Sequence, residues 1–157
     1  MDTGPDVRRS KARPQHVVAA MPRLDRVIET AIYVDDLVRA AAFYDEIMEL
    51  PLMVCDARFR AYDIGGESVF LVFKRGATLD TVHLPGGTIP PHDGHGPLHM
   101  AFGVAADELP NWERRLTEKG VAIEARTAWP RGGYSIYFRD PDNHLLELVT
   151  RGVWKIY

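Results

Sequence analysis

The sequence has little of three features that often reveal a protein's class: cysteine, long apolar runs and a strong excess of charge. Its 157 residues include a single cysteine, Cys55, which excludes a disulfide within the chain and predicts a reducing, cytoplasmic compartment. No apolar run approaches the roughly 18 residues that span a membrane, so we expect no membrane partner. The formal net charge of −3 disfavours nucleic acid as a partner, because phosphate backbones attract basic surfaces.

What remains is the composition of an ordinary globular domain. Hydrophobic residues make up 46% of the chain and charged residues 26%, as in most folded proteins. The beginning of the chain differs, because Arg8, Arg9 and Lys11 are interspersed with Pro5 and Pro14. We therefore predict a disordered tail over residues 1–22 and a single domain over residues 23–157, which is long enough to bury a core.

The predicted elements occur twice in the same order: a strand, a helix and three strands. In the first copy, Asp35 or Asp36 caps the helix and Pro51 ends it. The predicted segments are 26–34, 37–48, 52–55, 59–64 and 68–73 in the first copy, then 98–104, 107–119, 121–125 and a final hairpin over 135–149. The pattern predicts an α+β fold of two tandem βαβββ modules, over about 26–75 and 97–151, that form one concave mixed sheet.

Between the modules, residues 76–96 are rich in glycine, proline and histidine. This composition predicts a long loop, and loops of that length in a compact domain are usually functional or disordered. His83, His92 and His95 either order this loop or serve substrate closure or metal binding.

The final hairpin carries the most informative residue. Aliphatic and aromatic runs flank a turn in which Pro141 and Asn143 favour the turn conformation. In the second run, 145–149, Glu147 is the one charged residue among aliphatic ones. A carboxylate in that setting needs an arginine, a proton or a metal ion as its partner. We interpret Glu147 as a metal ligand, with an ion pair to an arginine as the alternative.

Two more potential ligands stand at equivalent positions of the repeat. Glu29 and His99 both lie on the first strand of their module, each two residues before an alanine. The position of Glu147 is occupied in the first module by Leu71. Two carboxylates and one imidazole, if they converge, suit a borderline divalent ion such as Mn, Fe(II), Co, Ni or Zn. The alternatives are a core histidine at His99 and a salt bridge from Glu29 to an arginine.

The segments around these residues resemble a known family. They are Glu29 to Leu37, Phe43-Tyr44, His99 to Phe102, and Tyr137 to Glu147. Together they resemble the vicinal oxygen chelate superfamily, which includes glyoxalase I, fosfomycin-resistance thiol transferases, extradiol dioxygenases and bleomycin-resistance proteins. The resemblance covers about residues 26–151.

This resemblance implies a fold, a cofactor and an assembly. The fold is the pair of βαβββ modules, and the cofactor is one divalent metal ion held by Glu29, His99 and Glu147. The assembly is a homodimer, in which Glu29 of one chain can meet the other two ligands of its partner. The first ligand in the family is often histidine, and bacterial glyoxalase I has a fourth, acidic ligand where this chain has Leu71.

Other residues are candidates for contact with a small-molecule substrate. Tyr137 precedes Glu147 in the hairpin, and Ser135 shares its face by alternation. Arg131 and Arg60 are candidate partners for a substrate anion, and Tyr33 is a further candidate contact. For catalysis we expect Glu29 or Glu147 to move a proton and Tyr137 to donate a hydrogen bond or a proton.

Two functions follow from these residues. The first is a metal-dependent enzyme acting on a small oxygen-chelating substrate, by glyoxalase-like lyase or isomerase chemistry or by dioxygenation. The second is a binding protein of the bleomycin-resistance type, which holds a drug or another small molecule without chemistry. Ligand-type side chains in register at three positions favour the enzyme.

Overall fold

The computed structural model describes residue 1 and residues 21–157, so most of the predicted tail lies outside the described residues. Module one consists of β1 (Glu29–Val34), α1 (Leu37–Glu46), β2 (Leu52–Cys55), β3 (Phe59–Ile64) and β4 (Ser68–Lys74). Module two consists of β7 (His99–Gly103), α2 (Leu109–Glu118), β8 (Ile123–Ala128), β9 (Tyr134–Arg139) and β10 (Leu145–Val149). The predicted α+β class with two βαβββ modules is confirmed. In the described part of the chain, neither helix is long and apolar enough to cross a membrane.

The two modules have the same topology, as expected of a duplication. The predicted single concave sheet is wrong, because each module forms its own four-stranded sheet, with the order β1-β4-β3-β2 in module one and β7-β10-β9-β8 in module two. In both sheets the first strand pairs in parallel with the last. Leu71 lies opposite Ala31, and Glu147 lies opposite Ala101. The register therefore places Leu71 and Glu147 at equivalent positions.

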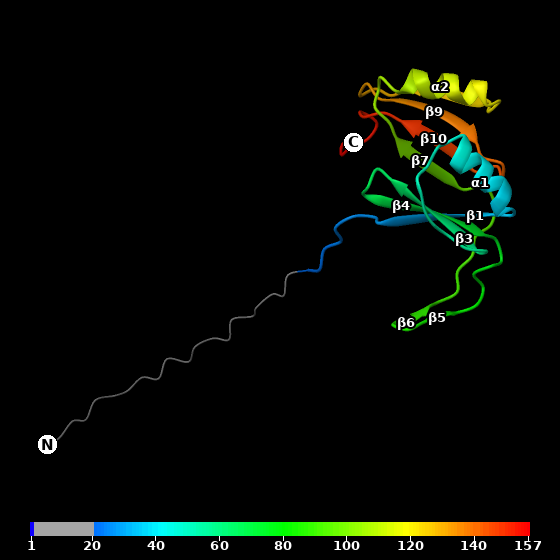
Figure 1. Ribbon diagram of the computed structural model, residues 1–157. Helices are drawn as coiled ribbons and strands as arrows, with labels where there is room; N and C mark the ends of the chain where they lie inside the picture. The colour runs from blue at the N-terminus through cyan, green and yellow to red at the C-terminus, as the bar shows by residue number, and fades with distance from the viewer. Residues whose placement is uncertain (2–20) are drawn as a thin grey trace.

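One hydrophobic core joins the modules. It contains Ile32, Val34, Phe70 and Val72 from one sheet, Phe102, Ile136, Phe138, Leu146 and Leu148 from the other, and residues of both helices. Figure 1 shows α1 between the two sheets and α2 over the sheet of module two. Because side chains alternate along a strand, the opposite face of each sheet, here called its outer face, points away from this core. Glu29 lies on one outer face, and His99 and Glu147 lie on the other.

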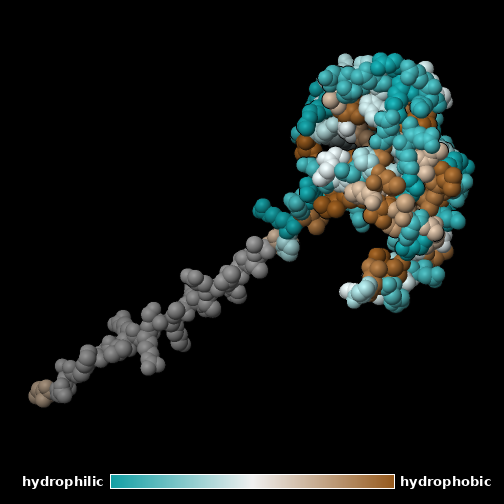
Figure 2. Space-filling model, viewed as in Figure 1, coloured by the Kyte–Doolittle hydropathy of each residue, from teal (hydrophilic) through white to brown (hydrophobic). Residues whose placement is uncertain are grey.

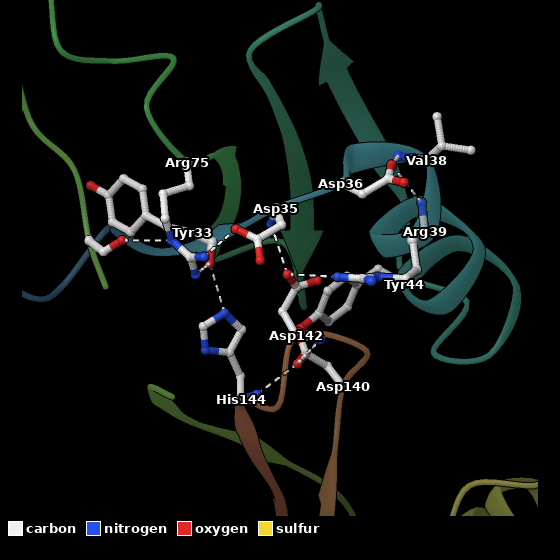
Figure 3. Close-up of polar contacts among 11 residues, drawn as sticks. Tyr33, Asp35, Asp36, Val38, Arg39, Tyr44, Arg75, Asp140, Asp142 and His144 are labelled. Carbon is white, nitrogen blue, oxygen red and sulfur yellow. Dashed lines mark hydrogen bonds and ion pairs between the residues drawn. The ribbon is translucent and has the colours of Figure 1, made fainter. Parts of the chain in front are cut away.

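A fully buried histidine fastens the two modules together (Figure 3). His144 Nε2 is 2.9 Å from the backbone oxygen of Tyr33, and its Nδ1 is 2.9 Å from the backbone nitrogen of Leu98. Because a carbonyl oxygen only accepts and an amide only donates, Nε2 carries the ring hydrogen. This one side chain thus ties the end of β1 to the start of β7.

Two aspartates of the β9–β10 turn extend the same fastening (Figure 3). Asp142 accepts a hydrogen bond from the backbone nitrogen of Asp35 at 2.7 Å and pairs with Arg39 at 3.0 Å. Asp140 accepts hydrogen bonds from the Tyr44 hydroxyl at 2.8 Å and from the His144 backbone. Burial raises the pKa of Asp140, although these hydrogen bonds oppose the shift. Burial, together with the neighbouring Asp140 carboxylate, also raises the pKa of Tyr44. Polar groups of the turn are therefore satisfied mainly by module one.

The segment between the modules contains structure that its composition did not predict. Within it, β5 (Val82–Leu84) and β6 (Gly87–Ile89) form a hairpin, because Pro85-Gly86 favours a tight two-residue turn between two short runs. Figure 2 shows hydrophobic residues on this projecting hairpin, where Leu84 and Ile89 are exposed. Its base is fixed by His92, whose Nδ1 lies 2.7 Å from the Tyr33 hydroxyl.

Replacing His144 should loosen the fold strongly. His144→Ala leaves the Leu98 amide without its partner, takes one of two partners from the Tyr33 carbonyl, which keeps Arg75, and empties the space of a fully buried ring, so we expect the free energy of unfolding to fall by about 2–4 kcal/mol. Urea denaturation measures this as a lower midpoint with an unchanged slope. His83→Ala, on the exposed β5, is the control, and a loss no larger than that of the control would contradict the role given to His144.

Candidate functional site

The outer face of the module-two sheet carries three rows of side chains across β7, β10 and β9. The strand register gives their members. Row one is His99, Leu145 and Arg139; row two is Ala101, Glu147 and Tyr137; row three is Gly103, Val149 and Ser135. Three of the residues that the sequence singles out, His99, Glu147 and Tyr137, lie together in rows one and two.

His99 is oriented by the backbone beside it. Its Nδ1 is 3.1 Å from the carbonyl oxygen of Leu145, so Nδ1 carries a hydrogen and donates it. Its Nε2 is turned towards Glu147, 3.3 Å from Oε2. A backbone carbonyl that accepts from one ring nitrogen while the other is left for an ion is the usual arrangement of a metal-binding histidine.

Glu147 lies in a nearly closed environment, with 9% of its side chain exposed. Its Oε1 accepts a hydrogen bond from the Tyr137 hydroxyl at 3.1 Å, while Oε2 faces His99. Two atoms with lone pairs face each other at this distance when a hydrogen or a cation lies between them. Either a shared hydrogen or a bound cation would fill that position.

The geometry fits a shared metal ion. Donor atoms that bind one ion at about 2.1 Å, with angles between 90° and 109°, lie about 3.0–3.4 Å apart. The separation of 3.3 Å between His99 Nε2 and Glu147 Oε2 falls in this range. Both side chains could therefore bind one ion with small adjustments of their rotamers.

Tyr137 is suited to donate a hydrogen bond rather than to ionise. Burial and the neighbouring Glu147 carboxylate raise the pKa of Tyr137, although a hydrogen bond with Ser135 opposes the shift. The phenol therefore stays protonated near neutral pH. It holds the Glu147 carboxylate in place and is a hydrogen donor beside the candidate ion.

Glu29 is not part of this group within one chain. It is exposed on the outer face of the module-one sheet, where it lines one pocket with Ala101, the strand neighbour of Glu147. Among residues 21–157, no three His, Cys, Asp or Glu side chains lie close enough to hold an ion together. One chain thus supplies two of the three predicted ligands at this position.

Ser135 and Arg131 lie near the site but differ in accessibility. Ser135 is in row three, 1% exposed, and its hydroxyl accepts a hydrogen bond from Trp129 Nε1 at 2.8 Å. Its hydroxyl is therefore already engaged inside the protein. Arg131 is exposed in the turn between β8 and β9, where its guanidinium is free to meet an anion.

Arg60 and Tyr33 lie away from His99 and Glu147. Arg60 shares the core-facing side of β3 with Tyr62, to whose hydroxyl it donates at 2.8 Å, and forms an ion pair with Asp45 of α1. Arg60 faces the core side of its sheet, and its charge is already paired with Asp45. Its position thus does not support the predicted contact with substrate. Tyr33 is on the outer face of module one and is covered by His92 and Gly94.

One part of this face, the segment after β10, was not predicted from the sequence. Tyr157 lies directly over Gly103 of row three, where an added Cβ would overlap its ring. A glycine in a strand interior often marks a close approach of another part of the chain. Gly103 was therefore a usable signal in the sequence, although it does not say which residue approaches.

Comparison with known proteins gives one family and several relatives. The family model for the Glyoxalase/Bleomycin resistance protein/Dioxygenase superfamily matches residues 23–148. A metallothiol transferase FosB from Bacillus licheniformis is 29% identical over 122 residues, 77% of this chain and 72% of that protein. A fosfomycin resistance protein FosX from Listeria innocua is 39% identical over 51 residues, 32% of this chain and 38% of that protein. Among solved structures, lactoylglutathione lyase from Agrobacterium tumefaciens superposes with a TM-score of 0.76 at 26% identity, covering 85% of this chain and 99% of that one.

The geometry predicts that His99 is required for a bound ion. Purified wild-type protein should contain or take up about one divalent ion per chain, and His99→Ala should lose it, because Nε2 is one of two donors that one chain supplies. Elemental analysis after dialysis measures the content. His95→Ala, in the segment between the modules, is the matched control; equal metal content in the His99→Ala protein would contradict the site.

Proposed function

The chain belongs to the glyoxalase/bleomycin resistance protein/dioxygenase superfamily, and from this membership we propose that it is a divalent-metal-dependent enzyme that adds a thiol to fosfomycin or a related small phosphonate. The observation that carries the proposal is the facing pair of His99 Nε2 and Glu147 Oε2, 3.3 Å apart. The reaction class is supported by the likeness to proteins named metallothiol transferase and fosfomycin resistance protein.

In this proposal, the metal ligands are His99 and Glu147 of one chain and Glu29 of a second copy. Glu29 is exposed and lies on the other outer face, so a second chain can bring it to the pair without rearranging the core. The proposed active unit is therefore a homodimer with two shared sites. The ion, when bound, would act as a Lewis acid towards neighbouring oxygens of the substrate.

Side chains of the protein supply the other roles in the proposed reaction. In thiol addition, a sulfur–carbon bond forms as an epoxide carbon–oxygen bond breaks, and the released oxygen takes up the proton that the thiol loses. Tyr137 is the nearest neutral hydrogen donor, because its hydroxyl lies 3.1 Å from Glu147 Oε1. It is therefore placed to stabilise negative charge on the oxygen released from the epoxide. Glu147 would hold the ion together with His99, whose Nε2 faces its Oε2. Arg131 is a candidate contact for the anionic group of the substrate.

Three other functions receive less support. Glyoxalase-like isomerisation is favoured by the likeness to lactoylglutathione lyase, but the position equivalent to Glu147 in module one holds Leu71, which cannot bind a metal or carry a proton. Drug binding without chemistry does not require an imidazole held against a nearly buried carboxylate. Dioxygenation depends on Fe(II), which metal analysis would identify.

The reaction is tested directly with fosfomycin. Wild-type protein loaded with Mn, Mg, Ni or Zn should consume fosfomycin together with cysteine, glutathione or bacillithiol, giving a thiol adduct detectable by mass spectrometry. Glu147→Gln should lower the rate by about 100-fold or more, and Tyr137→Phe by about 10–100-fold. Tyr134→Phe, on an exposed residue of the same strand, is the control. Absence of any adduct with every ion and thiol would refute the proposed reaction.

Mixed dimers test whether the site is shared. Glu29→Ala and His99→Ala proteins should each be inactive, but a dimer of one chain of each kind contains one intact site. Random exchange of equal amounts should restore about a quarter of wild-type activity, because about half of the dimers are mixed and each has one of two sites. If both ligands act within one chain, mixing restores nothing.

A further inference from the structure

Two members of row three of the module-two outer face, Val149 and Ser135, are more deeply covered than His99 of row one. Val149 is only 6% exposed, yet it does not belong to the hydrophobic core, because it lies on the other side of the sheet. Ser135, beside it, is 1% exposed, whereas half of the His99 side chain is exposed in row one. Something outside the core therefore closes the row-three end of this face.

Trp129 covers part of this row through its hydrogen bond to Ser135, and the C-terminal segment, Arg151–Tyr157, folds back over Gly103. Figure 1 shows it beside the ends of β7 and β10. Two glycines permit this reversal: Gly152 has a φ of 104°, and an added Cβ on Gly133 would lie 2.7 Å from the backbone nitrogen of Val153. The backbone nitrogen of Gly152 donates to the carbonyl oxygen of Tyr157 at 2.9 Å, which closes the segment into a compact loop.

Tyr157 occupies the space that the missing side chain of Gly103 leaves. An added Cβ on Gly103 would overlap the hydroxyl oxygen of Tyr157 and lie 2.8 Å from its Cζ. The Arg151 guanidinium lies over the Tyr157 ring, 5.0 Å from its centroid. A cation over an aromatic face holds the ring in position, so the tyrosine is supported both by the sheet below and by Arg151.

This cover stands next to the candidate metal pair. Successive rows on one face of a strand are about 6.6 Å apart, twice the rise per residue. Tyr157, over Gly103, is therefore one row from the row of Glu147 and two rows from His99. A molecule bound at the ion and extending along β7 from row two meets the Tyr157 ring after about one row.

We propose that the C-terminal segment is an end wall of the substrate site, and that Tyr157 over Gly103 sets how far a bound molecule extends along the sheet. The inference rests on the proposed metal site at His99 and Glu147. It identifies a residue that determines specificity, and it predicts that the enzyme accepts short substrates and discriminates against longer ones.

Alkyl hydroxamates are suitable probes, because they chelate divalent ions through two neighbouring oxygens whatever the natural substrate is. The experiment measures the dissociation constants of acetohydroxamate and octanohydroxamate for metal-loaded protein by calorimetry, with metal content determined in parallel. In Tyr157→Ala, the preference for the long probe over the short one should rise by about tenfold relative to wild type, since the pocket gains room for methylene groups. Tyr134→Ala, which removes an exposed tyrosine from the same sheet, should keep the wild-type preference.

A second variant tests the contact itself. Gly103→Ala places a methyl group where the Tyr157 hydroxyl lies, so it should displace the wall and change the preference in wild type. In the Tyr157→Ala background the same substitution should have no further effect, because there is no ring to displace. Such coupling between two positions is not expected if either residue acts only on global stability.

The possible outcomes separate the two proposals. An unchanged length preference in both variants, with one ion bound per chain, overturns the end wall and leaves the metal site standing. A raised preference in Tyr157→Ala, coupled to Gly103→Ala, supports the wall. If wild-type protein takes up no ion, the metal site fails and the end wall fails with it.

Discussion

The arrangement of this protein depends on one buried side chain, His144. Its ring gives a hydrogen bond to the end of β1 and takes one from the start of β7, which fixes the two modules against a single core. Because one face of each sheet is buried in that core, only the outer faces are accessible to a ligand. The same fastening that makes the fold compact also holds Glu29 on a different sheet from His99 and Glu147, and in the proposed function a second chain supplies Glu29 to complete the three-ligand site.

Within the site, the backbone sets the orientation of the candidate side chains. The carbonyl of Leu145 sets the tautomer of His99, and strand pairing places Tyr137 directly opposite Glu147. These constraints come from regular sheet structure rather than from loops, so the donor atoms are held before any ion arrives. A site whose side chains are already ordered loses little side-chain conformational entropy when it binds an ion.

Much of this was readable in the sequence, because alternation and turn chemistry are local. The duplication, the cap at Asp36 and the left-handed Asn143 agree with the structure, and the face shared by Tyr137 and Glu147 follows from hairpin register. What could not be read depends on contacts distant in sequence. The pairing of Arg60 with Asp45 is one example, and the return of Tyr157 onto Gly103 is another. The β5–β6 hairpin was missed for a different reason: its strands are too short to show a period.

The position of Leu71 opposite Ala31 has an evolutionary consequence. One half has a carboxylate at this position and the other has a leucine. Under the proposed site, the half with Glu147 supplies two ligands, whereas the half with Leu71 supplies only one. Substitutions on the outer face of module one would then disturb fewer metal ligands than substitutions on module two.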